Sequence, residues 1–244
     1  MHVSGAEWLL IACTVVAAAT VQGVVGFGSN LLAVPVVALV VPAALPGAMV
    51  FPGTPMSFAM AVHERHHIDW RGSAYIFAGR VPGTMLGVAI VAAVSPDVLA
   101  IVVGVIVVLA VLVSVFANHL HPGVTPTAAS VTGVVTGITG TAAAIDGPPL
   151  ALLYQNDPAP LFRSTLATQF SIGTIFTIVG LLLGGQLHGW QVLLGLSLVP
   201  CYLAGLALSI LVRPHVMRRS LRPVVLVIAA LTGTAAIARA VLAG

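Results

Sequence analysis

Two passages of this chain combine glycine, proline and polar side chains in a way that could bind a small anion. The first covers residues 22–35 and the second residues 136–149. At a single offset of 114 residues, the matching pairs are Gly23 and Gly137, Gly26 and Gly140, and Pro35 and Pro149. A helix that restarts within a membrane presents unpaired N–H groups at the positive end of its dipole, which favours an anion. Each passage therefore predicts half of a binding site.

Polar residues stand where each restarted helix would begin. Ser29 and Asn30 would cap the first restart, while Asp146 suits the N-cap of the second and Pro148 its first turn. We expect the anion to lie between the two tips, near the middle of the membrane. The residues expected to bind it are Gly26, Phe27, Gly28, Ser29, Asn30, Thr139, Gly140, Thr141, Asp146 and Gly147.

Two ionisable residues fall inside apolar stretches, where such residues are candidates for function. Arg80 could attract or gate an anion, or it could anchor the chain to lipid headgroups. Asp146 could cap a helix, or it could titrate and couple proton movement to transport. Together with Gln169 and Thr54 they form the expected gating or coupling group. Further candidate donors are Gln22, Ser57 and Ser171.

A competing pattern, H-E-x-x-H, covers residues 63–67. On a helix, His63 and His67 would bind zinc and Glu64 would serve as base. With Asp146 as a third ligand, this would make an intramembrane zinc protease. The charged residues in and after the motif suit a solvated loop instead. We therefore expect a protein that is not an enzyme and that holds no metal or other cofactor.

Composition places the chain in a membrane. Of its 244 residues, 59% are hydrophobic and only 6% are charged, which leaves almost nothing for a soluble surface. The chain contains no lysine, so it lacks the phosphate-binding motif of ATPases, and direct coupling to ATP hydrolysis is not expected. The expected partners are a small anionic substrate and the lipid bilayer, and not nucleic acid.

Long apolar stretches predict an all-α integral membrane protein with ten segments. About 20 residues are needed to cross the hydrocarbon core as a helix. The second and seventh segments are too short, so they are interpreted as return legs of broken or re-entrant hairpins. This predicts eight full spans plus hairpins, or up to ten crossing segments. The segments are Trp8–Val25, Phe27–Val41, Pro46–Val62, Ser73–Val94, Val98–Phe116, Pro126–Ala144, Pro148–Tyr154, Thr165–Leu183, Trp190–Val212 and Pro223–Leu242.

Arginine placement predicts the orientation, because cytoplasmic loops collect Arg and Lys. Four arginines between residues 213 and 222 mark one loop as cytoplasmic, and Arg163 and the loop of residues 62–71 should lie on the same side. The counterpart of that loop, residues 184–191, carries no arginine and should lie outside. Equivalent loops then face opposite sides. We expect two inverted repeats of about five segments, residues 1–120 and 121–244, with both termini outside and no soluble domain.

Several motifs carry a resemblance to a known family. They are the glycine passage with its following proline, Ile68-Asp69-Trp70, Gly147-Pro148-Pro149 and Ala151-Leu152-Leu153-Tyr154. In these the chain resembles the TauE/SafE family of sulfite exporters and sulfonate permeases over nearly its whole length. The resemblance implies a bacterial inner-membrane permease for sulfite or for a small organic anion that bears a sulfonate or carboxylate.

The chain departs from the family pattern at the hairpin tips. Family members often keep three glycines there, whereas this chain has Ser29-Asn30 in the first copy and three alanines, residues 142–144, in the second. Side chains at Asn30 and near Asp146 are therefore expected to tune the ligand. The resulting prediction is a secondary transporter for a small oxyanion that works by alternating access. A passive anion channel is the alternative that shares the site.

Small-residue helix faces have two interpretations. Glycines three or four residues apart, such as Gly79, Gly83 and Gly87 or Gly133 and Gly137, commonly let membrane helices pack closely. When they face outward, such stripes can also join two copies of a chain. The sequence leaves open whether the protein forms a homodimer and whether transport is coupled to protons.

Overall fold

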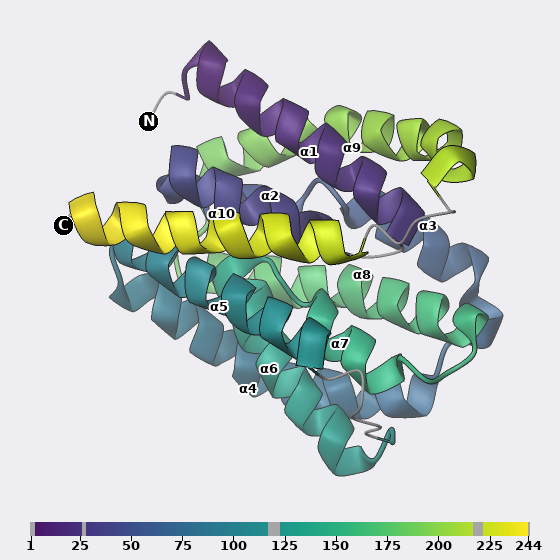
Figure 1. Ribbon diagram of the computed structural model, residues 1–244. Helices are drawn as coiled ribbons and strands as arrows, with labels where there is room; N and C mark the ends of the chain where they lie inside the picture. Colours follow the sequence, from purple (N-terminus) through teal and green to yellow (C-terminus); the bar gives the residue numbers. More distant parts are fainter. Residues whose placement is uncertain (1–2, 26–27, 117–122, 217–221, 244) are drawn as a thin grey trace.

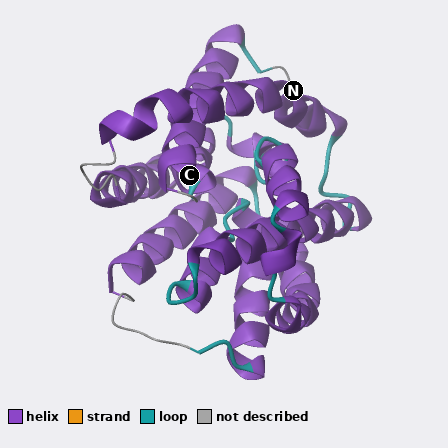
Figure 2. Cartoon of the chain, turned by 90° about the vertical axis from the view of Figure 1, so that its right-hand side faces the viewer, coloured by secondary structure: helices purple, strands orange, loops and turns teal. Residues whose placement is uncertain are grey.

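The chain folds into a bundle of helices joined by short loops (Figure 1). The computed structural model describes residues 3–25, 28–116, 123–216 and 222–243. Within these ranges all regular structure is helical, which confirms the predicted all-α class (Figure 2). The α-helices are α1 Gly5–Val25, α2 Ser29–Val40, α3 Thr54–His63, α4 Trp70–Ala93, α5 Pro96–Phe116, α6 Pro126–Ala143, α7 Gly147–Tyr154, α8 Ala159–Leu183, α9 Gly189–Val216 and α10 Arg222–Ala243. The short 3₁₀ turns are η1 Pro42–Ala44, η2 Gly47–Val50 and η3 Arg65–His67.

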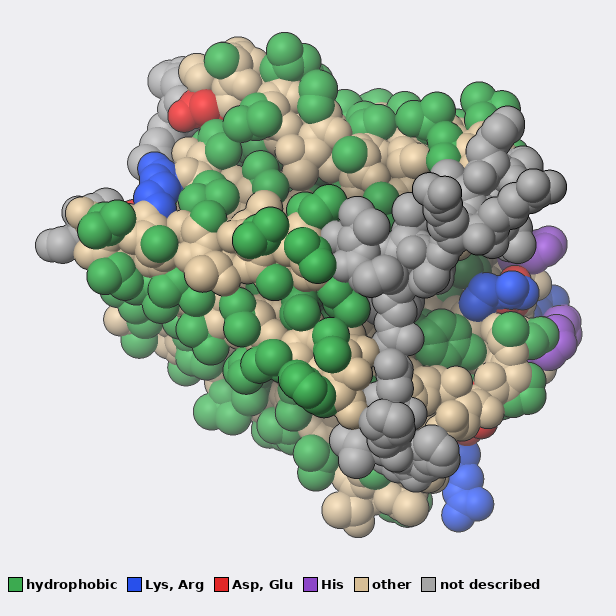
Figure 3. Space-filling model, viewed as in Figure 1, with side chains coloured by type: hydrophobic (Ala, Val, Ile, Leu, Met, Phe, Trp, Pro, Cys, Tyr) green, Lys and Arg blue, Asp and Glu red, His purple; other side chains and the backbone are tan. Residues whose placement is uncertain are grey.

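Helix length and surface character both indicate a membrane protein. In the described part of the chain, α1, α4, α5, α8 and α9 are long and apolar enough to cross a bilayer. Large apolar side chains such as Leu109, Leu193 and Ile210 are exposed on the outside of the bundle. Figure 3 shows such side chains across the visible face, with the histidines and most of the visible basic side chains toward its right-hand edge and one basic side chain at its left. Lipid solvates a surface of this kind, so the chain is a multi-pass membrane protein.

The expected third segment, Pro46–Val62, is not a single helix, so this prediction was wrong. A bend at residues 51–53 separates η2 from α3. Pro52 lacks a backbone N–H and Gly53 is a poor helix former, so together they weaken the helix at this point. The break matters for the site because it brings Met49 and Thr54 to the level of the hairpin tips.

Helices α4 and α6 pack closely along glycine faces. Gly79 and Gly83 of α4 lie against the α6 backbone at Ser130 and Val134, and Gly133 of α6 lies against the backbone of α4. A Cβ atom at any of these glycines would overlap the facing backbone. The packing interpretation is therefore confirmed for these glycines.

We expect Gly83→Val to destabilise the protein. The added side chain would meet the α6 backbone at Val134, which cannot move aside as a flexible side chain would. Overpacking of this kind costs about 1–3 kcal/mol. The measurement is the thermal unfolding midpoint of the purified protein in detergent. The control is Gly189→Ala, because a Cβ at Gly189 meets no atom. Equal unfolding midpoints for the two variants would contradict the packing role of Gly83.

Helices α4 and α8 begin side by side at one end of the bundle. There the N–H of Asp69, just before α4, donates to Oγ1 of Thr165 in α8 at 3.0 Å. Arg65, Arg71 and Arg163 belong to the same region, in η3 and near the starts of α4 and α8. We call this the arginine end. Both chain termini lie toward the opposite end (Figure 1).

Candidate functional site

The first hairpin, α1–α2, restarts at a glycine. Gly28 has a φ of 97°, a left-handed conformation that costs glycine little. Helix α2 then begins at Ser29, whose N–H donates to Oε1 of Gln22 at 3.0 Å. Gln22 on α1 thus satisfies one of the free donors at the start of α2 and holds the restart in place. Gly26 and Phe27, two of the predicted site residues, lie outside the described residues.

The second hairpin, α6–α7, turns at the end of its glycine passage. Helix α6 continues through Gly140 to residue 143, and the chain turns at Ala144, which has a left-handed φ of 54°. The turn falls between the predicted segments Pro126–Ala144 and Pro148–Tyr154, as expected. Helix α7 begins at Gly147 with Pro148 and Pro149. Because proline has no backbone N–H, this restart offers an anion fewer donors than the sequence argument assumed.

A hydrogen bond from one side chain joins the two hairpin tips. Nδ2 of Asn30 on α2 donates to the carbonyl oxygen of Ala144 at 2.8 Å, and it also lies 3.3 Å from the carbonyl oxygen of Met49. Asn30 therefore bridges the first tip, the second tip and the 3₁₀ turn η2. This agrees with the expectation that the two tips meet.

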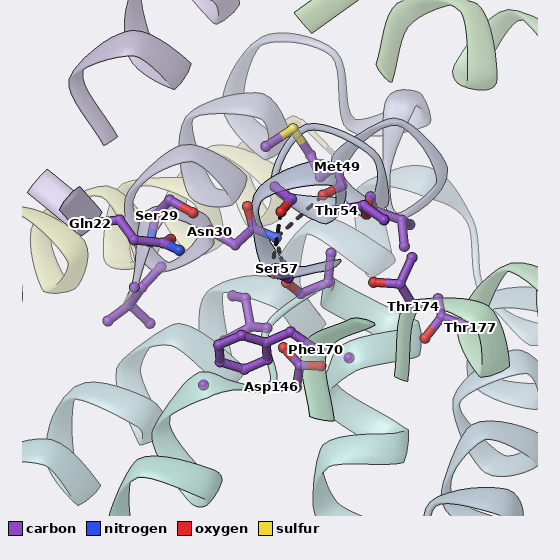
Figure 4. Close-up of a pocket in the computed structure, with 18 of the residues that line it drawn as sticks. Gln22, Ser29, Asn30, Met49, Thr54, Ser57, Asp146, Phe170, Thr174 and Thr177 are labelled. Carbon is purple, nitrogen blue, oxygen red and sulfur yellow. Dashed lines mark hydrogen bonds between the residues drawn. The ribbon is translucent and has the colours of Figure 1, made fainter. Parts of the chain in front are cut away.

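A pocket of about 80 Å³ lies between the tips and α3, α4, α8 and α9. This is roughly the room taken by two or three water molecules, which also suits a small oxyanion. Figure 4 shows Gln22, Ser29 and Asn30 on one side of this central pocket and Thr174 and Thr177 on the other. The lining residues are Gln22, Gly28, Ser29, Asn30, Leu31, Met49, Val50, Gly53, Thr54, Ser57, Arg80, Gly140, Ala144, Ile145, Asp146, Gly147, Pro148, Phe170, Thr174, Thr177 and Tyr202.

The central pocket contains a buried ion pair. Nη2 of Arg80 on α4 donates to Oδ2 of Asp146 at 2.8 Å. The Arg80 side chain is only 1% exposed, so it cannot reach lipid headgroups, and the lipid-anchor interpretation was wrong. Asp146 occupies the N-cap position of α7, but its carboxylate makes no capping hydrogen bond there. The capping interpretation of this side chain was also wrong, because the carboxylate is bound to arginine instead.

The guanidinium of Arg80 fits into a gap left by two glycines. Side chains at Gly140 of α6 or Gly173 of α8 would press against the guanidinium, and at Gly173 the overlap would be severe. The Nε and Nη1 atoms of Arg80 are buried and have no hydrogen-bond partner. Buried charged donors without partners are costly, so they mark a place for an acceptor. A planar cation with unused donors beside a polar pocket can hold an oxyanion.

Most of the predicted binding and gating residues line the central pocket. Those that do so are Gly28, Ser29, Asn30, Thr54, Arg80, Gly140, Asp146 and Gly147. Thr139, Thr141 and Gln169 lie outside its wall. Oγ1 of Thr141 lies 3.3 Å from Oγ1 of Thr177, whereas the Thr139 hydroxyl and the Gln169 amide are buried without partners.

Residues of α8 and α9 that the sequence did not single out complete the site. Phe170, Thr174 and Thr177 on α8 and Tyr202 on α9 line the pocket, and Gly173 lies under the guanidinium. Phe170, Thr174 and Thr177 recur at helical spacing, which puts them on one side of α8. This spacing in the sequence could have indicated that the three residues share a side of α8. Nothing in the neighbouring sequence shows that this side faces a cavity rather than another helix.

Helix α7 is held to α4 at both of its ends. Asp146 at its start binds Arg80, and the hydroxyl of Tyr154 at its end donates to Oδ2 of Asp69 at 3.0 Å. The other carboxylate oxygen of Asp69 accepts the N–H of Gly72 at 2.9 Å. In the following loop, burial and the negative charge of Asp69 raise the pKa of Asp157. The second hairpin is therefore tied to α4 at the pocket and at the arginine end.

The H-E-x-x-H motif does not form one helical face. Helix α3 ends at His63, Glu64 follows as its C-cap, and His67 lies in the separate turn η3. Oε1 of Glu64 pairs with Nη2 of Arg163 at 3.3 Å, and Asp146 is held in the central pocket by Arg80. The geometry that the zinc-protease alternative requires is therefore missing, and that alternative was wrong.

A bundle of long apolar helices, with a buried cation beside a small polar pocket between two broken hairpins, defines a membrane transporter. Residues 10–236 match the sequence model of the family described as sulfite exporter TauE/SafE, and the chain belongs to that family. This is a family of transporters and not of enzymes, which implies a small anionic substrate and a bilayer as partners. No curated protein and no solved structure matches the chain.

Proposed function

We propose that the protein is a secondary transporter that carries a small oxyanion, such as sulfite or an organosulfonate, across the bacterial inner membrane by alternating access. The observation that carries the proposal is Arg80, a buried cation on the wall of the pocket between the hairpin tips, with two unpaired guanidinium nitrogens. Oxyanions satisfy such donors with strong charge-assisted hydrogen bonds. Ser29 on the pocket wall supplies a further hydroxyl group, whereas the hydroxyls of Thr54 and Ser57 already donate to backbone carbonyl oxygens.

The helix packing supports two inverted repeats, residues 1–120 and 121–244. If α1–α5 correspond to α6–α10, then the packing of α4 on α6 corresponds to that of α9 on α1, and both pairs are in extensive contact. Helices α5 and α10, and likewise α3 and α8, pack against their own counterparts. The hydrogen bond from Asn30 to Ala144 joins positions 114 residues apart, which is the offset of the sequence repeat. A pseudo-two-fold axis near the pocket would produce contacts of this kind.

The same symmetry supports access from both sides of the membrane. We place the arginine end in the cytoplasm, because positive residues collect on that side, and both termini outside. The arginine end carries Arg65, Arg71 and Arg163, and the two termini lie toward the other end of the bundle (Figure 1). The first hairpin then enters from outside and the second from the cytoplasm. Their tips meet at the central pocket, so movement of either hairpin could open it to one side.

The test is transport by the purified protein in proteoliposomes. We expect uptake of radiolabelled sulfite that unlabelled sulfite or sulfoacetate inhibits, and faster uptake when the opposite side is preloaded with unlabelled sulfite. A carrier is expected to show this acceleration because its binding site must return to the first side of the membrane after each transport step. A passive channel would not show it. Absence of sulfite, sulfoacetate and related-anion flux from well-folded protein would overturn the proposal. Empty liposomes and Arg80→Gln protein are the controls.

A further inference from the structure

Several buried polar groups near the central pocket lack hydrogen-bond partners. In the described part of the chain, the residues with such side-chain atoms are Glu64, Ser73, Arg80, Thr84, Thr139 and Gln169. All of them except Glu64 lie on α4, α6 or α8. Native proteins leave few buried polar atoms unpaired, because each one gives up its hydrogen bonds to water. A concentration of them on three neighbouring helices indicates a place where a polar solute passes.

Among the members on α4, α6 and α8, Ser73 and Gln169 lie nearest the arginine end. Both residues are 0% exposed, and neither the Ser73 hydroxyl nor the Gln169 amide has a partner. Neither residue lines the central pocket. Other buried hydroxyls on α8 bond to their own helix; that of Thr168, for example, donates to the carbonyl oxygen of Ser164 at 2.8 Å. The Gln169 amide therefore differs from these hydroxyls of α8.

The contacts between α4 and α8 place both residues at a similar level of the bundle. The two helices run in the same direction, since Asp69 contacts Thr165 near their starts and the Arg80 guanidinium lies against Gly173 further along. Ser73 falls between the two contact levels on α4, and Gln169 falls between them on α8. At a rise of 1.5 Å per residue, Ser73 lies ~10 Å before Arg80 along its helix, and Gln169 lies ~6 Å before Gly173. Both lie between Arg80 and the arginine end.

We propose that Ser73 and Gln169 form a second, inner station for the transported oxyanion, on the route between the central pocket and the arginine end. The inference rests on the proposed function. A hydroxyl and an amide NH₂ can donate to an oxyanion, and Ser73 also lies within about one turn of the start of α4, the positive end of its dipole. The station contains no charged side chain of its own, so it binds weakly and releases the anion readily. A route with several weak sites conducts better than one with a single tight site.

The test separates passage of the anion from stability and from binding. Neither side chain makes a hydrogen bond within the protein, so Ser73→Ala and Gln169→Leu remove a desolvation cost and should leave the unfolding midpoint unchanged or higher. The affinity for sodium sulfite, measured by calorimetry, should stay within about twofold of wild type because Arg80 is intact. The initial rate of sulfite flux in proteoliposomes should fall about tenfold in Gln169→Leu, the equivalent of one hydrogen bond to a charged group.

Thr168→Val is the matched control, because it removes a buried hydroxyl that is already satisfied on the same helix. It should keep wild-type flux and lose a little stability. Wild-type flux in both station variants would overturn the proposal, as would a fall in stability that parallels the fall in flux. A parallel fall in affinity and flux would assign the residues to the central pocket and overturn a separate station. If Gln169→Leu does not fold, Ser73→Ala carries the test. Absence of sulfite binding and flux in the wild type would instead overturn the proposed function.

Discussion

In calorimetric titrations with sulfite, Arg80→Gln is expected to lower the affinity at least about a hundredfold and to abolish flux in proteoliposomes. Each hydrogen bond to a charged group is worth about 1.5–3 kcal/mol, so the loss of two charge-assisted bonds accounts for this size of effect. Arg80 is also the only cation among the residues that line the pocket, and glutamine removes its charge while keeping much of its length. The anion would then have only hydroxyl and amide donors.

Arg80→Lys separates charge from geometry at this position, and Arg163→Gln tests an arginine elsewhere. Arg80→Lys keeps the charge but presents it as a point, without the planar set of donors, so we expect partial affinity. Arg163→Gln removes an arginine that is 47% exposed and paired with Glu64, and it should retain wild-type affinity because exposed ion pairs contribute little. Wild-type sulfite affinity in Arg80→Gln would contradict the assignment of Arg80 as the anion-binding group.

The hairpins could be predicted from sequence because their cause is local. Glycine and proline limit helix continuation wherever they occur, so the two repeated passages indicated broken helices without any knowledge of packing. The second tip lies between the predicted segments Pro126–Ala144 and Pro148–Tyr154. The roles of single residues within that passage were not predictable in this way: Gly137 and Gly140 remain helical, Gly137 packs against the α4 backbone, and Ala144 makes the turn in a left-handed conformation that no local residue preference indicates.

The ion pair depended on contacts between distant parts of the chain. Arg80 and Asp146 are 66 residues apart, and each had two interpretations in the sequence. The choice between those interpretations followed from the close approach of α4 and α6, which carries Arg80 inward and away from lipid. Gly173 is a similar case. A single glycine in a membrane helix usually indicates packing, and only the guanidinium that lies against it shows that its missing side chain makes room for a charge.

The ion pair also implies competition between Asp146 and the substrate. One oxygen of Asp146 accepts from the same guanidinium that we propose binds the anion, so the carboxylate partly neutralises the charge that attracts it. An anion that approaches Arg80 is also repelled by the Asp146 carboxylate, because that carboxylate is in contact with the same guanidinium. The sequence left open whether transport is coupled to protons, and Asp146 is the carboxylate at the central pocket on which that coupling can be tested.

Asp146→Asn is therefore expected to tighten sulfite binding about tenfold and to make flux independent of an imposed proton gradient. Asparagine keeps the size of the side chain but leaves the Arg80 charge uncompensated, so binding of an anion should also raise the unfolding midpoint by more than in the wild type. The measurements are calorimetry, sulfite-induced thermal shift and flux with and without a pH gradient. Asp157→Asn, in the loop after α7, is the matched control and should behave as wild type. Among the described residues, only Arg80 forms an ion pair with Asp146. Retention of gradient-dependent flux in Asp146→Asn would assign proton coupling to another group.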